Sequence, residues 1–504
     1  MYRHRPNTFN ILSIFPKRYI IAAALSLFTL WFLTARSHGG QRSHGGWMSR
    51  AEFVTRALEK DIYVNEYDGK AIRKLCKEAD WRDDRVATCD MIAGGIGNLK
   101  TNLLACARYS IEAGAMLVIP FIHPREAFGR MEKSFAWDTD LPVSYMFDSE
   151  HFFNTLAEDC PQLRIVDEND KTLNIPPKSE AHVIGPKRLI AAEYGHVLIE
   201  PGRWRPALDE YIKEQILSKN NLPEPTREHP LRIGFDDGIA FSWPVAYDGD
   251  DFRNNWGHLA RFPGYIRELS ARALYNLYRK IDIQQSPAAP STGAFLGAHV
   301  RTEKDVQVYA WTSYEMQSAS IREQLTANNL SVVYVATGTA SDVERLKRDV
   351  ADMQIPVNET HTTGVQVFQK WDILDEEDLM LMDTLTWDQM ALVDLDIMLR
   401  SSRFVGIWES SWSWTIALKR HAWSKENPYD YDAHPVTYED EFSIIYGPTR
   451  AQPVIDPCLW LTVEFGWDRP VSGERAIWER EIISSGTPCF LKIVGDSGPL
   501  FDPI

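Results

Sequence analysis

The sequence lacks the motifs of several common enzyme classes. It has no histidine and cysteine cluster at zinc-site spacing, no Gly-x-x-x-x-Gly-Lys loop and no Gly-x-Ser-x-Gly turn. Basic residues are in deficit, because 54 lysines and arginines stand against 70 aspartates and glutamates and leave a net charge of −16. These absences argue against kinases, hydrolases and proteins whose main partner is nucleic acid.

Acidic residues are missing altogether from the first 50 positions, which carry seven basic ones. Two of these, Arg18 and Arg36, enclose an apolar run from Tyr19 to Ala35 without glycine, proline or charge. As a helix the run would be about 26 Å long, close to the hydrocarbon thickness of about 27 Å in the endoplasmic reticulum membrane. We expect a transmembrane signal anchor over residues 19–35, with a cleaved signal peptide as the alternative.

The basic residues also predict the orientation of this segment. They precede the apolar run, so residues 1–18 stay in the cytosol and the rest of the chain enters the lumen. Residues 36–50 repeat Ser-His-Gly-Gly and are expected to form a flexible stem. The prediction is a single-pass type II protein of the Golgi or endoplasmic reticulum membrane, with its remaining domains in the lumen.

Cysteines are few, and all six follow the apolar run. Their even number favours disulfides in an oxidising compartment, although other connectivities stay open and Cys106 is placed like a core residue on a helix face. The favoured pairs are Cys76 with Cys89 and Cys458 with Cys489. Two N-glycosylation sequons, at Asn329 and Asn358, agree with a lumenal location.

Strands and helices alternate in two parts of the lumenal chain. The first part has an expected strand at 91–93, a glycine loop at 94–98, a helix from Leu99 that Gly114 ends, and a strand at 116–119. The second part has expected strands at 295–300, 332–336 and 404–406, with helices at 313–327, 341–353, 386–399 and 414–420. The alternation predicts an α/β protein with two mostly parallel sheets that helices cover on both faces.

A Pro/Ser/Ala-rich stretch at 284–291 is the expected linker between these parts. It separates an N-terminal domain over 51–285 from a C-terminal domain over 292–440, followed by a tail over 441–504 that could pack back on the N-terminal domain. A ligand between two such halves lies at the carboxyl ends of the strands. The polar residues that follow three of the strands should therefore share one rim, namely Arg301 and Asp305, Thr337, and Glu409 to Ser411.

Four motifs on this frame resemble the GDP-fucose protein O-fucosyltransferases. His299-Val300-Arg301, with Asp305 four residues after the arginine, is similar to the family's His-x-Arg-x-x-x-Asp signature. Three further stretches of the chain resemble other motifs of the family. The stretch from Asp394 through Ser410-Ser411-Trp412 resembles its last motif, and Gly94 to Asn98 resembles its Gly-x-x-Gly-Asn loop. Val335 to Thr337 resembles the end of its nucleotide-side strand. The four motifs stand in the family's order along the chain.

The resemblance implies a GT-B fold, in which two Rossmann-like domains face a central cleft. It also implies an inverting, metal-independent transfer of fucose from GDP-fucose to a protein or glycan hydroxyl, with no cofactor. Residues 51–285 would lie on the acceptor side, and residues 292–440 would bind the GDP-sugar. Arg301 and Asn98 are the expected catalytic residues. The expected donor-binding residues are Gly95, Gly97, His299, Asp305, Thr337, Asp394, Ser410, Ser411 and Trp412.

Arg301 suits this chemistry, because its planar guanidinium can bind the diphosphate with two hydrogen bonds and neutralise the charge that forms on the leaving group. Asp305 would orient Arg301 or another ligand group. The general base stays unassigned, since the loop from Gly94 to Gly97 lacks the glutamate that some family members carry there. We therefore expect a stepwise reaction that is driven by departure of the leaving group, with a weak base or none. The sequence identifies neither the acceptor nor the donor sugar.

Two other hypotheses stay open. The first is a metal-dependent transferase of the GT-A fold, which would use an Asp-x-Asp pair to hold the cation. Candidate pairs are Asp138 with Asp140, Asp248 with Asp250, Asp394 with Asp396, and Asp430 with Asp432. The second is a catalytically inactive lumenal protein that keeps the same fold as a binding module.

Overall fold

The computed structural model describes residues 47–89, 95–123, 140–170, 173–193, 197–236, 239, 242–303, 306, 311–424 and 436–447. The elements below belong to one compact unit that begins at Arg50. Across the described ranges, no helix is both long and apolar enough to cross a membrane. The expected span over 19–35 and the expected strand at 91–93 lie outside these residues.

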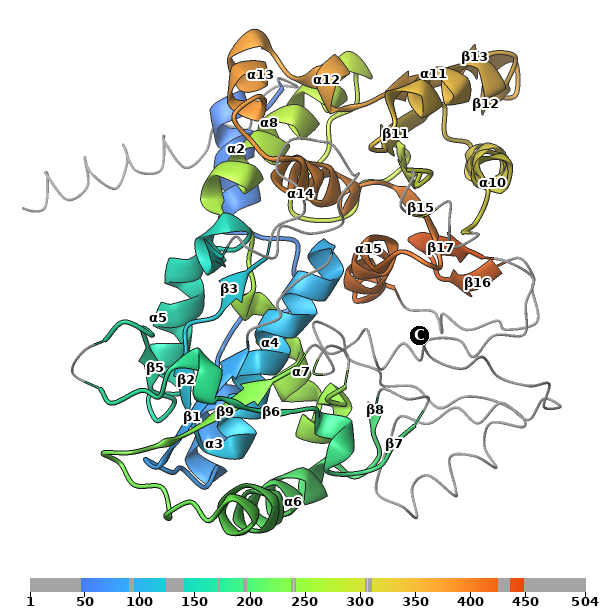
Figure 1. The fold of residues 1–504 in the computed structure, drawn as a ribbon. Coiled ribbons are helices and arrows are strands. Elements are labelled where there is room, and N and C mark those ends of the chain that lie inside the picture. The colour runs from blue at the N-terminus through green and yellow to red at the C-terminus, as the bar shows by residue number, and fades with distance from the viewer. Residues whose placement is uncertain are drawn as a thin grey trace, which may run out of the picture. The chain divides into compact units, whose positions relative to one another are not determined.

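The first half is built on a five-stranded parallel sheet in the order β5-β2-β1-β9-β6 (Figure 1). Its strands are β1 (Arg85–Cys89), β2 (Met116–Val118), β5 (Ile165–Val166), β6 (His182–Ile184) and β9 (Leu231–Phe235). All five residues of β1 and of β9 are buried, as expected for central strands covered on both faces. Two short hairpins also occur, β3 (Phe121–Ile122) with β4 (Leu141–Pro142) and β7 (Ala192–Glu193) with β8 (Val197–Leu198).

The helices of the first half are α2 (Arg50–Glu59), α3 (Lys70–Glu78), α4 (Ile96–Ala113), α5 (Ser149–Asp159), α6 (Trp204–Tyr211), α7 (Asp250–Trp256) and α8 (Gly264–Lys280). A π-helical turn over Ile212–Ser218 continues α6. Gly114 ends α4, as the sequence predicts. Its φ of 62° is left-handed, and its N–H donates back to the carbonyls of Ile111 and Ser110.

The second half contains a six-stranded sheet in the order β14-β11-β10-β15-β17-β16, parallel except for β16. Its strands are β10 (Leu296–His299), β11 (Val332–Ala336), β14 (Gln366–Phe368), β15 (Arg403–Ile407), β16 (Val436–Glu439) and β17 (Ser443–Tyr446). The sheet thus runs to Tyr446, beyond the boundary at 440 that the sequence suggests. A separate hairpin joins β12 (Gln354–Asn358) to β13 (His361–Gly364).

Helices cover both faces of this sheet. They are α10 (Tyr314–Ala327), α11 (Ala340–Asp349), α12 (Lys370–Ile373), α13 (Glu376–Met382), α14 (Trp387–Met398) and α15 (Ser411–His421). On one face, Ala298, Val335 and Val405 share a buried cluster with Ile321 and Leu325 of α10. The other face packs against α14 and α15. The architecture is therefore α/β with two parallel sheets, consistent with the GT-B fold.

Helices α2 and α8 of the first half also contact the second half (Figure 1). Arg50 at the start of α2 forms ion pairs with Asp375 and Asp378, and Arg272 of α8 binds Asp378 at 2.9 Å. The Asp378 side chain is completely buried between these arginines. Helix α8 packs along α14 as well. Residues 50–59 and 264–280 therefore pack against the helices of the second half, although they precede the linker.

The described disulfides join Cys76 to Cys160 and Cys89 to Cys106. The predicted pair of Cys76 with Cys89 is wrong. Cys76 lies on α3, which packs against the helix that Cys160 follows, whereas Cys89 ends β1 next to α4. Cys458 and Cys489 lie outside the described residues. The two disulfides indicate an oxidising compartment of the secretory pathway.

Candidate functional site

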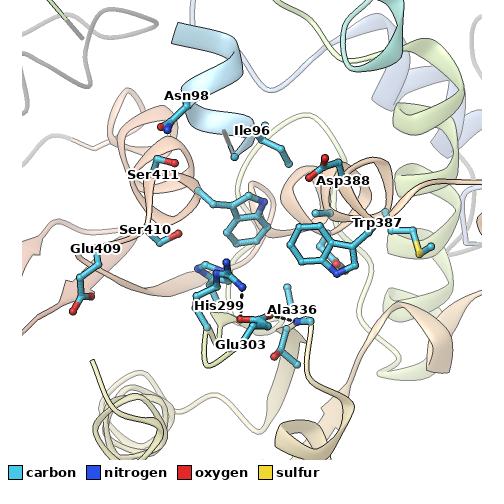
Figure 2. Close-up of a pocket in the computed structure, with 18 of the residues that line it drawn as sticks. Ile96, Asn98, His299, Glu303, Ala336, Trp387, Asp388, Glu409, Ser410 and Ser411 are labelled. Carbon is cyan, nitrogen blue, oxygen red and sulfur yellow. Dashed lines mark hydrogen bonds and ion pairs between the residues drawn. The ribbon is translucent and has the colours of Figure 1, made fainter. Parts of the chain in front are cut away.

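A cavity of about 430 Å³ lies at the carboxyl ends of β10, β11 and β15 (Figure 2). These strand ends are adjacent because His299 pairs with Ala336, and Ala298 pairs with Val405. Nine of the predicted site residues line the cavity: Gly95, Asn98, His299, Arg301, Thr337, Asp394, Ser410, Ser411 and Trp412. Asp305 lies outside the described residues, and Gly97 lies just outside the cavity lining.

Gly97 instead sets how two helices cross. A Cβ at this position would lie 2.8 Å from the Ser411 carbonyl oxygen and 2.8 Å from Thr415 Oγ1, closer than real Cβ contacts occur. The missing side chain lets α4 pack directly on α15, and the two helices lie side by side in Figure 1. Both helices begin at the cavity, where their N-cap residues are Gly95 and Ser410. Their first backbone N–H groups and positive dipole ends suit an anionic ligand.

Arg301 is held from several sides. Its side chain is only 9% exposed and forms an ion pair with Glu303 at 2.5 Å. Gln317 of α10 fixes the Arg301 backbone, accepting from its N–H at 2.9 Å and donating to its carbonyl at 3.0 Å. The Trp311 ring centroid lies 6.0 Å from the guanidinium carbon. The arginine is thus positioned in the cavity before any ligand binds.

Glu303, which the sequence analysis did not single out, connects two of the strand ends. One carboxylate oxygen accepts from the Gly338 N–H at 2.7 Å, just after β11, and the other accepts from the Thr302 N–H at 3.0 Å. The same side chain pairs with Arg301. The sequence alone gives little indication that Glu303 belongs to the site, because a glutamate two positions after an arginine is common on protein surfaces. Its role becomes visible only when β10 and β11 lie side by side.

His299 is buried and uncharged. Its Nδ1 lies 2.7 Å from Ser413 Oγ, and its ring lies 4.3 Å from that of Trp412. Burial, together with the charge of Arg301, lowers the pKa of His299 to about 3. A neutral imidazole cannot neutralise a phosphate at physiological pH. The two contacts join His299 to Trp412 and Ser413 in the first turn of α15.

Both carboxylate oxygens of Asp394 have protein partners. Its Oδ1 accepts from the Tyr334 hydroxyl at 2.6 Å, and its Oδ2 lies 2.5 Å from Lys370 Nζ. The carboxylate therefore positions Lys370, which lines the cavity as a second cation besides Arg301. Lys370 follows β14 and lies 24 positions before Asp394 in the sequence. No local pattern in the sequence connects the two.

Two further carboxylates, Glu409 and Asp388, line the cavity. Glu409 accepts from the Thr312 N–H at 2.7 Å and from the Thr312 hydroxyl at 3.0 Å, and burial raises the pKa of its carboxyl group. Asp388 is 4% exposed and lies in the first turn of α14. The lining also contains Trp311, Trp371, Trp387 and Trp412, whereas Trp414 belongs to the core.

The described residues contain no group of three potential ligands that could hold a metal ion. Both fully described Asp-x-Asp pairs are bound by cationic side chains. Asp394 binds Lys370, Asp396 binds Arg400, Asp248 binds Arg108, and Asp250 binds Arg253. The pairs that begin at Asp138 and Asp430 lie wholly or partly outside the described residues.

No protein-family model and no curated protein matches the sequence. Among solved structures, the chain is similar to POFUT1 in complex with GDP-fucose, at 15% identity over 73% of this chain and 99% of that one, with a TM-score of 0.38. It is similar to the α-1,6-fucosyltransferase NodZ co-crystallised with GDP, at 14% identity over 67% and 92% of the two chains, with a TM-score of 0.32. A variant of Arabidopsis thaliana FUT1 in complex with GDP shares 14% identity over 76% and 80%, with a TM-score of 0.34.

Proposed function

We propose that this protein transfers fucose from GDP-fucose to a protein or glycan hydroxyl, with inversion and without a metal ion. One observation carries the proposal. Residues from each of the four stretches that resemble the fucosyltransferase motifs come from distant parts of the sequence, yet they line a single cavity. That cavity brings Arg301, Lys370 and the N-termini of α4 and α15 to the carboxyl ends of three neighbouring strands.

The charges in the cavity fit a nucleoside diphosphate. Breaking the bond between sugar and diphosphate leaves negative charge on the β-phosphate oxygen, which fixed donors or a metal must stabilise. Arg301 supplies a bidentate guanidinium and Lys370 an ammonium group. Ser410 adds a hydroxyl that makes no cap hydrogen bond to its own helix, and α15 adds its first N–H groups. In this proposal these groups do the work of the cation in metal-dependent transferases.

The other predicted residues take defined places in the same proposal. Thr337 and Gly338 follow β11 and would face the nucleoside, while Asn98 of α4 would approach the sugar from the first half. His299 and Asp394 would act through their neighbours, Trp412 and Lys370, and do not contact the reacting atoms. Residues 51–285 would lie on the acceptor side. The two disulfides and the N-terminal apolar run support a type II protein of the Golgi or endoplasmic reticulum membrane.

Calorimetric titration of the purified full chain with GDP, UDP, GDP-fucose and GDP-mannose, all in excess EDTA, tests the donor class. We expect GDP and GDP-fucose to bind in EDTA, UDP to bind more weakly, and Arg301→Ala to weaken GDP binding. Release of GDP from GDP-fucose, followed by chromatography, then tests for chemistry. Preference for UDP, or activity that EDTA abolishes and Mn²⁺ restores, would contradict the proposal and favour a metal-dependent transferase.

A further inference from the structure

The indole N–H of Trp412 is a buried polar group without a protein partner. Trp412 is 9% exposed, and its Nε1 atom is buried with no hydrogen-bond acceptor among the described residues. An indole N–H can only donate, so a nearby donor cannot satisfy it. Nearly all buried donors in folded proteins have a partner, and an exception calls for a physical reason.

The position of Trp412 suggests that reason. It lies in the first turn of α15, two residues after the N-cap Ser410, and it lines the cavity. Its ring lies 4.3 Å from that of His299, the last residue of β10, and Figure 2 shows His299, Ser410 and Ser411 around this part of the cavity. Arg301 follows His299 by two positions and lines the same cavity. Trp412 therefore lies next to both groups that would hold the diphosphate, Arg301 and the N-terminus of α15.

Two nearby tryptophans provide comparisons for this N–H group. Trp414 belongs to the core, and its Nε1 donates to the Trp408 carbonyl oxygen at 2.6 Å. Trp423 has a buried Nε1 that, like that of Trp412, finds no acceptor within the described ranges, but Trp423 does not line the cavity. Of the buried indole nitrogens that lack an acceptor in the described part of the chain, only that of Trp412 belongs to a cavity-lining residue.

We infer that the indole N–H of Trp412 donates a hydrogen bond to an oxygen of the donor's diphosphate, an assignment that rests on the proposed transfer from GDP-fucose. A phosphate oxygen is a charged acceptor, and hydrogen bonds to charged groups are stronger than those between neutral groups. The indole carries no charge, so it adds a donor beside Arg301 without repelling the guanidinium. As the bond to the sugar breaks, negative charge grows on the β-phosphate oxygen, and a fixed donor next to it stabilises that charge.

Calorimetric titration of the full chain and of Trp412→Phe tests the assignment. Phenylalanine keeps an aromatic ring beside His299 and removes the N–H group. We expect GDP and GDP-fucose to bind the variant roughly 10- to 100-fold more weakly, the loss expected for a hydrogen bond to a charged group. The factor should be the same for both ligands, because both carry the diphosphate. A loss confined to GDP-fucose would place the contact on the sugar and overturn the assignment.

Trp423→Phe and Trp414→Phe are the matched controls. Trp423→Phe removes a similar buried N–H group away from the cavity, so it should change GDP binding by less than about twofold. In urea unfolding, Trp412→Phe should be less destabilised than Trp414→Phe, because only the latter leaves a buried carbonyl, that of Trp408, without its donor. Normal GDP binding by Trp412→Phe, or a loss of stability as large as that of Trp414→Phe, would overturn the assignment.

The indole proton signals in the nuclear magnetic resonance spectrum of the wild-type chain give a second measurement. Addition of GDP should move one indole N–H signal downfield, as formation of a hydrogen bond to an anion does, and Trp412→Phe should lack that signal. If Trp412→Phe does not fold, the absence of any downfield shift in the wild-type spectrum overturns the assignment. A wild-type chain that binds neither GDP nor GDP-fucose refutes the proposed function itself, whereas wild-type affinity in Trp412→Phe refutes the role of Trp412 alone.

Discussion

Arg301 and Glu303 form a buried ion pair in the middle of the candidate site, and separating their roles gives the sharpest prediction. Both side chains are 9% exposed and lie 2.5 Å apart. Removing one partner of a buried pair leaves an unpaired charge, which costs about 3 to 5 kcal/mol when no other group compensates it. Glu303 keeps two backbone N–H donors, from Gly338 and Thr302, so the expected cost of Arg301→Ala lies near the lower end, at about 3 kcal/mol.

Catalysis should respond differently from stability. If Arg301 stabilises the leaving diphosphate, Arg301→Ala should reduce turnover of GDP-fucose by roughly 10² to 10³. Arg301→Lys keeps the charge but loses the bidentate fork, so it should be impaired as well. The double variant Arg301→Ala, Glu303→Gln removes both charges of the pair. We expect it to regain part of the lost free energy of unfolding but none of the lost turnover, because the glutamine amide oxygen can accept from only one of the two backbone N–H groups that Glu303 binds.

Urea unfolding followed by fluorescence gives the stability of each variant, and chromatography of released GDP gives the turnover. Measured side by side, the two assays separate a structural ion pair from a catalytic arginine. Near-normal turnover by the double variant would refute the catalytic role of Arg301. A double variant as unstable as Arg301→Ala would refute the argument that the unpaired Glu303 carboxylate causes the destabilisation.

Three other predictions follow from packing, charge and protonation. Gly97→Ala should lower the thermal unfolding midpoint and weaken GDP binding, because the new Cβ would lie 2.8 Å from the Ser411 carbonyl oxygen. The control Gly264→Ala should leave thermal unfolding and GDP titration unchanged, because its Cβ would have no atom within 4 Å. Lys370→Met should weaken GDP binding about tenfold in calorimetry if the ammonium group contacts a phosphate. It should also lower the unfolding midpoint, because it leaves the buried Asp394 carboxylate without its cation. Burial lowers the pKa values of His258 and His299 from 6.5 to about 3, so both stay neutral in the folded state while the unfolded chain takes up protons below pH 6.5. The free energy of unfolding should therefore fall as the pH drops from 6.5 towards 3, by about 2 kcal/mol per histidine at pH 5, and urea unfolding of His299→Gln should lose its share of that slope.

The sequence by itself determined the elements that depend on local pattern. The run from Val332 to Ala336 is entirely apolar, and β11 has the same bounds. Ser313 and Thr386 precede amphipathic or apolar segments, and each accepts a hydrogen bond from the N–H three residues on, as an N-cap does. Because parallel strands end at one edge of a sheet, knowing β10, β11 and β15 was enough to predict that Arg301, Thr337 and Ser410 share one rim.

Only the tertiary structure decided which side chains act together. The pairing of Cys76 with Cys160 joins residues 84 positions apart, and Lys370 meets Asp394 across two separate helices. Glu303 belongs to the site because β10 and β11 are neighbours in the sheet. Gly97 lies where α4 crosses α15, because the two helices pack against each other there. A single sequence carries strong signals for the periodicity of apolar residues and for helix ends, since each depends on a few consecutive positions. Ion pairs, disulfides and close helix contacts depend on how segments that are distant in the sequence pack against one another. This packing is determined by the burial of the whole core, to which many residues each contribute a small part of the free energy.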